Sequence, residues 1–179
     1  MVYVCLASGF EEIEALVTVD ILRRAGLTVQ TVGIGSREVT GTHGITVMAD
    51  VADSELVICS PRAVVLPGGM PGMTNLLESA TVDALLRQAK EKDAYLCAIC
   101  ASPSVLGLKG YLDGLRATCY PGFEQNLKGA RVTPQAVVSD GKCITAKGAG
   151  VTQEFAFAIV QALTDEQLVQ RLRSEMQCR

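Results

Sequence analysis

Apolar positions along the chain change their period repeatedly, and each change marks an element. A short β-branched run at 2–7 predicts a buried strand. Apolar residues at 13, 16, 17, 21 and 22 give residues 11–26 a helical period, which Gly26 ends. A second strand is predicted at 28–35. Strand, helix and strand within about thirty residues form a βαβ unit, so the pattern predicts a parallel sheet.

The same alternation continues along the rest of the chain. Residues 36–62 carry a weaker pattern and predict a hairpin or two short strands with glycine-rich turns. Further strands are expected at 63–66 and 94–99, a strand pair at 136–146 turning at Asp140-Gly141, and helices at 81–93, 101–110, 151–163 and 165–176. With no linker or repeat, this predicts one α/β domain over residues 1–179, doubly wound around a mostly parallel sheet sandwiched by helices.

In sheets of this kind the functional site lies beyond the carboxyl ends of the strands. Four segments directly follow predicted strands, namely "SGFEE", "PGGMPG", "CASPS" and "KGAGVT". Chain order alone therefore predicts that these four segments meet at one edge of the sheet.

Charge and composition exclude several classes of function. The net charge of −3, from 16 basic and 19 acidic residues, offers no electrostatic footprint for nucleic acid. The first residues run directly into an apolar stretch without a basic flank, so we expect a cytoplasmic protein rather than a secreted one. No apolar run approaches the roughly 20 residues that a membrane span needs.

Two of the seven cysteines, Cys97 and Cys100, have the spacing of a redox or metal-binding pair. Three steps along an extended strand separate their Cα atoms by roughly 10 Å, whereas a disulfide needs about 7 Å. Zinc would need two further ligands, and no second such motif exists. We therefore expect no metal and no cofactor, with Cys97 as core filler inside the strand.

Cys100 stands where the strand gives way to a helix, and two interpretations are open. It is either a buried small residue or a reactive thiol at a nucleophile elbow, where the following helix dipole would lower its pKa. Glu14 favours the reactive interpretation because it shares the inward helix face with Thr18 and Ile21. Desolvation would raise the Glu14 pKa, and the protonated carboxyl could donate a hydrogen bond to the thiolate. A plain helix-surface acid is the alternative.

The remaining polar candidates carry weaker signals. Glu11 and Glu12 are expected to be a solvated helix face. The amides of Gly69 and Ala101 are placed to hold an oxyanion. His43, the only histidine, is expected in a peripheral loop, with nothing that brings it to Cys100 in the same chain.

The segments "FEEIEALVTVDILRRAG", "VVLPGGMPG", "AICASP" and "GAGVTQEFAFAIVQAL" resemble the ThiJ/PfpI superfamily, in the branch of the Parkinsonism-associated protein deglycase and the bacterial chaperone YajL. The resemblance covers residues 2 to about 163 and implies a flavodoxin-like α/β sandwich that forms a homodimer. It implies that Cys100 is the reactive cysteine, in a strained backbone conformation. Glu14 matches the protonated glutamate, and Gly69 and Ala101 match the oxyanion-hole amides.

The resemblance also implies roles for residues away from the elbow. Asp20 and Arg24 match a pair in the first helix, with Arg24 expected to help bind an anion near the site. His43 stands where relatives place a basic residue close to the dimer interface. Tyr120, in "ATCYPG", replaces a histidine that lies beside the cysteine in the deglycase. A tyrosine with a pKa near 10 is a poorer base at neutral pH.

Two functional hypotheses follow from this set. The first is a cysteine-dependent glyoxalase or deglycase that acts on methylglyoxal-type dicarbonyls or their early protein adducts, in which Glu14 moves the proton. The second is a redox-sensing chaperone whose Cys100 oxidises to a sulfinate. Amidase or peptidase activity is disfavoured because Tyr120 replaces the histidine.

Overall fold

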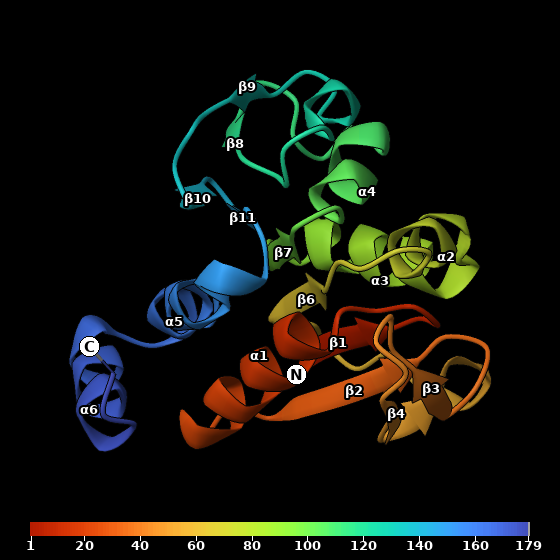
Figure 1. Ribbon diagram of the computed structural model, residues 1–179, viewed down its shortest axis with the longest axis horizontal. Coiled ribbons are helices and arrows are strands. Elements are labelled where there is room, and N and C mark those ends of the chain that lie inside the picture. Colours follow the sequence, from red (N-terminus) through yellow and green to blue (C-terminus); the bar gives the residue numbers. More distant parts are fainter. Residues whose placement is uncertain (179) are drawn as a thin grey trace.

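The computed structural model describes residues 1–178, and its chain forms a sheet between two layers of helices (Figure 1). The central sheet has the strand order β10-β11-β7-β6-β1-β2-β5. Only β10 runs antiparallel to its neighbour. The strands are β1 (Val2–Leu6), β2 (Val29–Gly33), β5 (Val51–Ala52), β6 (Ala63–Leu66), β7 (Tyr95–Ile99), β10 (Val137–Asp140) and β11 (Cys143–Ala146). The predicted doubly wound, mostly parallel sheet is confirmed.

Alternation along β1 assigns each layer of helices to one face of the sheet. Val2, Val4 and Leu6 join the apolar cluster of the first layer, whereas Tyr3 and Cys5 join that of the second. The first layer holds α1 (Glu12–Arg24), α5 (Thr152–Leu163) and α6 (Glu166–Glu175), and the second holds α2 (Gly72–Glu78), α3 (Ala80–Glu91) and α4 (Pro103–Leu108) (Figure 1). Both faces of the sheet are therefore buried, which suits parallel strands that read as continuous apolar runs.

Short elements lie outside these layers. They are the antiparallel pair β3 (Glu38–Thr40) and β4 (Thr46–Met48), the parallel pair β8 (Arg116–Ala117) and β9 (Arg131–Val132), and the 3-10 turns η1 (Asp53–Glu55), η2 (Glu124–Asn126) and η3 (Ala149–Val151). The hairpin expected within residues 36–62 is confirmed. The sequence pattern missed α2 and β5, since one follows a glycine-rich turn and the other has only two residues.

The cysteine pair behaves as its spacing predicts. Cys97 is fully buried inside β7, and Cys100 is the first residue beyond that strand. Both are free thiols. Cys97 therefore fills the core, and Cys100 lies at the end of the strand.

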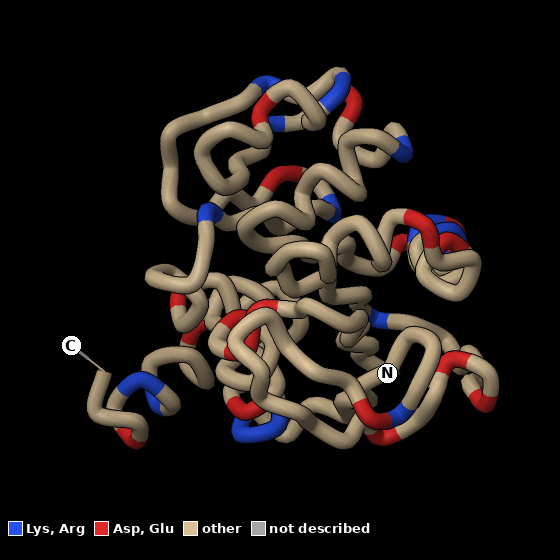
Figure 2. Tube along the Cα trace, turned by 45° about the vertical axis from the view of Figure 1, so that its right-hand side comes forward, with Lys and Arg blue, Asp and Glu red and all other residues tan. Residues whose placement is uncertain are grey.

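Charges of both signs are mixed along the trace of the chain (Figure 2). Large apolar side chains are also exposed, among them Ile13 and Leu16 on α1 and Ile45 and Met48 around β4. Of the helices within residues 1–178, none combines the length and the apolar character that crossing a membrane requires.

Candidate active site

The four segments that follow strands do meet at one edge of the sheet. The Glu11 amide donates to the Gly68 carbonyl at 2.8 Å, and the buried Ser102 hydroxyl donates to the Pro67 carbonyl at 2.6 Å. A Cβ placed on Gly148 would lie 3.9 Å from the Cys100 Sγ. This edge is therefore held together by hydrogen bonds between segments that are far apart in the sequence.

Cys100 is held in an unfavourable backbone conformation at this edge. Its φ of 65° lies in the left-handed region, which costs a non-glycine residue about 1–3 kcal/mol. Its N–H donates to the Ala146 carbonyl at 2.9 Å, and its carbonyl accepts the Tyr120 N–H at 2.8 Å. These bonds fix the elbow from both sides, and the side chain stays partly exposed. The strained elbow expected for Cys100 is thus present.

Glu14 reaches the elbow from the first turn of α1 and is fully buried. Its Oε2 accepts the Gly68 N–H at 2.8 Å. Its Oε1 is buried with no hydrogen-bond partner in residues 1–178. The Cys100 thiol lies close enough to alter the Glu14 pKa, although no well-formed hydrogen bond joins them. A Cβ on Gly68 would stand 2.6 Å from Cys100 Cβ and 2.7 Å from Glu14 Oε2, so only glycine fits between the two groups.

The acid and the thiol titrate as a coupled pair. Burial raises the pKa of Glu14 to about 7, against the lowering effect of the Gly68 amide. Burial, and then the charge of the Glu14 carboxylate, raise the pKa of Cys100 to about 12, while the Ala101 and Gly69 amides act in the opposite direction. The pair therefore releases one proton near neutral pH and retains the second well above it.

The expectation that the following helix would lower the Cys100 pKa is wrong. The helix α4 begins only at Pro103 and has 6 residues, so its dipole is short and starts beyond the cysteine. Burial and the neighbouring carboxylate outweigh the backbone donors. For Glu14, by contrast, the expected upward shift of its pKa is confirmed.

The predicted amide donors converge on the sulfur. The backbone N–H groups of Ala101 and Gly69 both act to lower the pKa of the Cys100 thiol, so both face its side chain. Gly69 has a φ of 93°, and a Cβ there would lie 2.4 Å from the Gly9 carbonyl oxygen and 2.5 Å from the Glu11 nitrogen. No other residue fits this position without moving the backbone, so the turn that aims the Gly69 amide depends on glycine.

A cavity of about 330 Å³ opens beside the cysteine. The ring of half-exposed Tyr120 borders it and would contact a Cβ on Gly148 at 3.3 Å. The other lining residues are Pro121, Lys147, Gly148, Ala149, Gly150 and Val151. Tyr120 is thus brought to the mouth of the site, as its predicted role requires, and the "KGAGVT" segment forms most of the wall.

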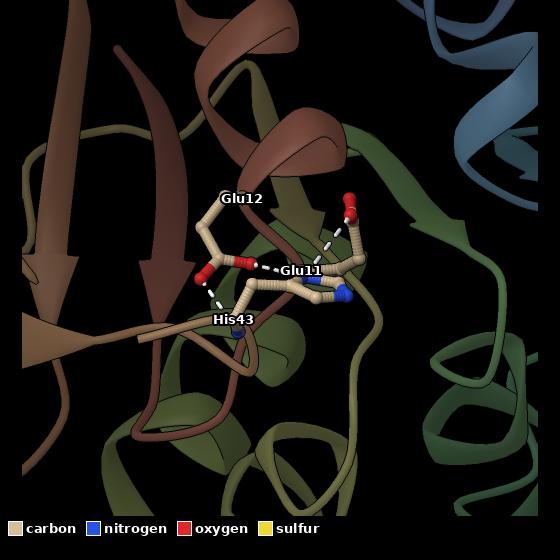
Figure 3. Close-up of side chains that lie close together, drawn as sticks. All are labelled: Glu11, Glu12 and His43. Atoms are coloured by element: carbon tan, nitrogen blue, oxygen red, sulfur yellow. Dashed lines mark hydrogen bonds and ion pairs between the residues drawn. The ribbon is translucent and has the colours of Figure 1, made fainter. Parts of the chain in front are cut away.

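His43, Glu11 and Glu12 form a cluster at the start of α1 (Figure 3). Glu12 Oε2 accepts a hydrogen bond from His43 Nδ1 at 2.9 Å. Glu12 Oε1 accepts hydrogen bonds from the His43 backbone N–H at 2.8 Å and from the Ile45 N–H at 3.3 Å. The expectation of a solvated helix face is wrong for both acids, since the side chain of Glu11 is only 12% exposed and that of Glu12 only 6%. The β3–β4 hairpin folds over α1 and buries this carboxylate. The hydrogen bond to Glu12 in turn raises the pKa of His43, whose ring remains largely exposed.

This cluster is also the one place in residues 1–178 where three metal-binding side chains converge. Their ligand atoms lie within 4.8 Å of one another. Both Glu12 oxygens already accept hydrogen bonds from the hairpin. Glu11 Oε2 accepts the Glu14 N–H at 2.7 Å as the N-cap of α1. The carboxylates are therefore engaged in holding the helix and hairpin together.

Arg24 is not brought to Cys100 within one chain. It lies in the last turn of α1, about 15 Å along the helix axis from Glu14. Its Nε donates to Asp20 Oδ2 at 2.6 Å, which is the pair that the family resemblance implies. His43 likewise contacts Glu12 and Glu11 rather than the cysteine. Sequence reasoning missed Lys147 in the cavity wall, although it begins a segment that was expected at this edge.

Comparisons with known proteins find relatives over most of the chain. A family model described as the DJ-1/PfpI family matches residues 1–162. The chain is similar to Protein dj-1beta of Drosophila melanogaster, with 35% identity over 172 residues that cover 94% of this chain and 92% of that protein. It is 34% identical to the glutathione-independent glyoxalase DJR-1.2 of Caenorhabditis elegans, over 86% of this chain and 82% of that protein. The solved structure of oxidized Toxoplasma gondii DJ-1 superposes with a TM-score of 0.93 at 31% identity, over 98% and 96% of the two chains.

Proposed function

The chain belongs to the DJ-1/PfpI family, and from this premise we propose that it is a glyoxalase that uses Cys100 and needs no cofactor. Its substrates would be methylglyoxal-type dicarbonyls, and its setting the cytoplasmic defence against carbonyl and oxidative stress. The observation that carries the proposal is the buried Glu14 carboxyl, with its unpartnered Oε1 among residues 1–178, beside the strained Cys100 thiol. The similarity to a relative named as a glutathione-independent glyoxalase supports the same activity.

The hydrogen-bond donors around the pair favour one arrangement of its proton. Two amides, from Gly69 and Ala101, face the sulfur and favour its charged form. The carboxyl receives a single amide, on Oε2. A buried anionic oxygen without a donor is costly, so a proton on Glu14 Oε1 and the negative charge on sulfur leave fewer groups unsatisfied. Near neutral pH the pair would therefore hold a thiolate next to a neutral acid.

The reaction then follows from these positions. The Cys100 thiolate adds to the aldehyde carbon of methylglyoxal, and the aldehyde oxygen takes the proton of Glu14, which gives a hemithioacetal and leaves Glu14 as a carboxylate. Glu14 removes the proton from that carbon and returns one to the adjacent carbon through an enediol, which produces a thioester of lactate. Water cleaves the thioester and releases lactate and the free cysteine. The amides of Gly69 and Ala101 would stabilise the oxyanions along this path.

The cavity suits substrates beyond the smallest dicarbonyl. Tyr120 and Pro121 line its exposed side, so an adduct attached to a larger molecule has a route to Cys100. The same addition of sulfur to a carbonyl carbon would act on early glycation adducts of proteins. We therefore include deglycation of such adducts in the proposal.

Steady-state formation of lactate from methylglyoxal tests this activity. We expect Cys100→Ser to reduce kcat by about three orders of magnitude, because a serine hydroxyl is not ionised near neutral pH. Cys59→Ser is the matched control, since Cys59 is an exposed thiol away from the cavity. Lactate formation that persists in Cys100→Ser would overturn the proposal.

Redox sensing with chaperone activity is the second candidate function. A partly exposed thiol beside two backbone amides that favour its charged form is suited to oxidation, and a neutral Glu14 could donate to a Cys100 sulfinate. The structure of the Toxoplasma gondii relative is of an oxidized form of that protein. Intact mass after mild peroxide treatment, followed by peptide mapping, tests whether Cys100 oxidises to a sulfinate. The absence of a two-oxygen product on Cys100 would exclude this role.

We also propose that the chain forms a homodimer. The exposed apolar side chains of Ile13 and Leu16 on α1 and Ile45 and Met48 around β4 support this assembly. Light scattering after size exclusion should give twice the chain mass, and Ile13→Asp should shift the protein to a monomer. A wild-type monomer at micromolar concentration would refute the assembly.

A further inference from the structure

The wall of the cavity contains one charged residue, Lys147. It directly precedes Gly148, and a Cβ added to Gly148 would lie only 3.9 Å from the Cys100 sulfur. The backbone of Lys147 is anchored, because its N–H donates to the Ala136 carbonyl at 2.9 Å. The backbone of the lysine is therefore fixed one residue from a glycine that lies against the nucleophile.

The Lys147 ammonium group has no protein partner in the part of the chain that the structure describes. Within residues 1–178 it forms neither an ion pair nor a side-chain hydrogen bond, although the residue is only partly exposed. Lys109 and Lys142, by comparison, pair with Asp83 and Asp93. Burial and the charge of Glu124 raise the pKa of Cys119, which adjoins Tyr120 in the sequence, and the charge of Lys147 acts on the same thiol in the opposite direction. Lys147 thus brings a positive charge, without an ion pair in residues 1–178, to the Tyr120 side of the cavity.

The volume of the cavity exceeds what the smallest dicarbonyl needs. At about 30 Å³ per water molecule, 330 Å³ holds roughly ten water-sized groups, about twice the number of non-hydrogen atoms in methylglyoxal. A substrate whose aldehyde carbon sits at Cys100 would therefore leave space toward Lys147. Apart from the lysine, the side chains around that space are apolar or aromatic.

We propose that Lys147 is a specificity-determining residue that selects 2-oxoaldehydes carrying an anionic group, such as a carboxylate. This inference rests on the proposed glyoxalase function and adds the substrate class. The anion would pair with the ammonium group while the aldehyde meets the sulfur. Such a contact orients the substrate without taking part in proton transfer, so it acts mainly on KM.

The test compares 4,5-dioxopentanoate with 2-oxopentanal, which differ only by a carboxylate in place of a terminal methyl group. We expect the wild type to prefer the carboxylate in kcat/KM by about tenfold, as one charged hydrogen bond allows. Lys147→Gln should abolish the preference through KM and leave turnover of 2-oxopentanal and methylglyoxal nearly unchanged. Lys142→Gln is the matched control, because it removes a lysine from the opposite end of β11.

A second measurement does not depend on catalysis. Iodoacetate and iodoacetamide have nearly the same shape and differ in charge, and each alkylates the cysteine sulfur as iodide leaves. The ratio of their rates at Cys100 should fall several-fold in Lys147→Gln and stay constant in Lys142→Gln. A wild type without carboxylate preference, or an alkylation ratio unaffected by Lys147→Gln, would overturn the anion-binding role of Lys147 and leave the proposed glyoxalase function standing. A wild type that turns over neither oxoaldehyde overturns the proposed function, and the alkylation ratio then decides the anion site.

Discussion

Replacing Glu14 by glutamine should separate the two titrations of the site. The substitution keeps the shape of the side chain and its contact with the Gly68 amide, but it removes the acid that shares a proton with Cys100. In the wild type the pair releases its first proton near the Glu14 pKa of about 7. In Glu14→Gln the thiol has to ionise alone in a buried site, with only the amides of Gly69 and Ala101 to stabilise it.

The expected shift can be worked from these contacts. Burial keeps the lone thiol at or above its ordinary pKa of roughly 9, while the loss of the carboxylate charge brings it below the value of about 12 in the intact pair. A midpoint near 9 instead of 7 lowers the thiolate fraction at pH 7 from about one half to about 1%, a cost of about 2.7 kcal/mol. The alkylation rate at pH 7 should fall roughly 50-fold, since the thiolate is the nucleophile.

The assay is the rate of iodoacetamide alkylation of Cys100 between pH 5 and 10, followed by peptide mapping. Cys59, which is exposed, reports on each sample as an internal control. A wild-type midpoint of 9 or above, or a midpoint that Glu14→Gln leaves in place, would refute the idea that acid and thiol share a proton.

Three further predictions follow from the same contacts. Gly69→Ala places a Cβ against backbone atoms at a φ of 93° and should lower the free energy of unfolding by about 3 kcal/mol. Gly148 lies in extended backbone, so Gly148→Ala should change the free energy of unfolding by no more than about 1 kcal/mol. It should instead reduce kcat/KM, because the added methyl group fills part of the cavity. Glu12→Ala should lower the unfolding free energy by about 1–3 kcal/mol and speed hydrogen exchange at the amides of His43 and Ile45, which would lose their acceptor. The first proton of the Glu14–Cys100 pair leaves at the ordinary glutamate pKa of 4.5 in the unfolded chain and at a pKa of about 7 in the folded one, so the stabilising contribution of the pair is complete below pH 4.5 and is lost as the pH rises through 7. Between pH 4.5 and 8, the free energy of unfolding of Glu14→Gln should therefore rise relative to that of the wild type by up to about 3 kcal/mol, as measured by chemical denaturation. Unfolding free energies of the two proteins that change in parallel with pH would contradict the buried acid.

The sequence predicted the layers of the fold because apolar period and chain order determine them. β6 ends at Leu66 as expected, and the turn at Asp140-Gly141 joins β10 to β11. The edge strand β5 went unseen because two residues carry no period. Helix α2 was missed since its apolar residues follow a turn rich in proline and glycine.

The site was predictable as far as local signals reach. Cys100 follows a strand and Glu14 lies on an inward helix face, and both facts are present in the sequence. The burial of Glu12 was not, because it depends on a hairpin some thirty residues away folding over α1. The direction of the Cys100 pKa was also missed, since it reflects burial and a charge brought from another element. Tertiary contacts of this kind leave no trace in local pattern.

The central claim is that Cys100 forms a covalent adduct with the aldehyde while Glu14 moves the proton, and the adduct can be measured directly. In Glu14→Gln the hemithioacetal should form and persist, because the group that removes its proton is gone. Rapid mixing with methylglyoxal at pH 9, followed by intact mass and peptide mapping, should show one added methylglyoxal on Cys100 and little lactate. Lactate formed at the wild-type rate without an adduct on Cys100, or with the adduct on another cysteine, would contradict the account.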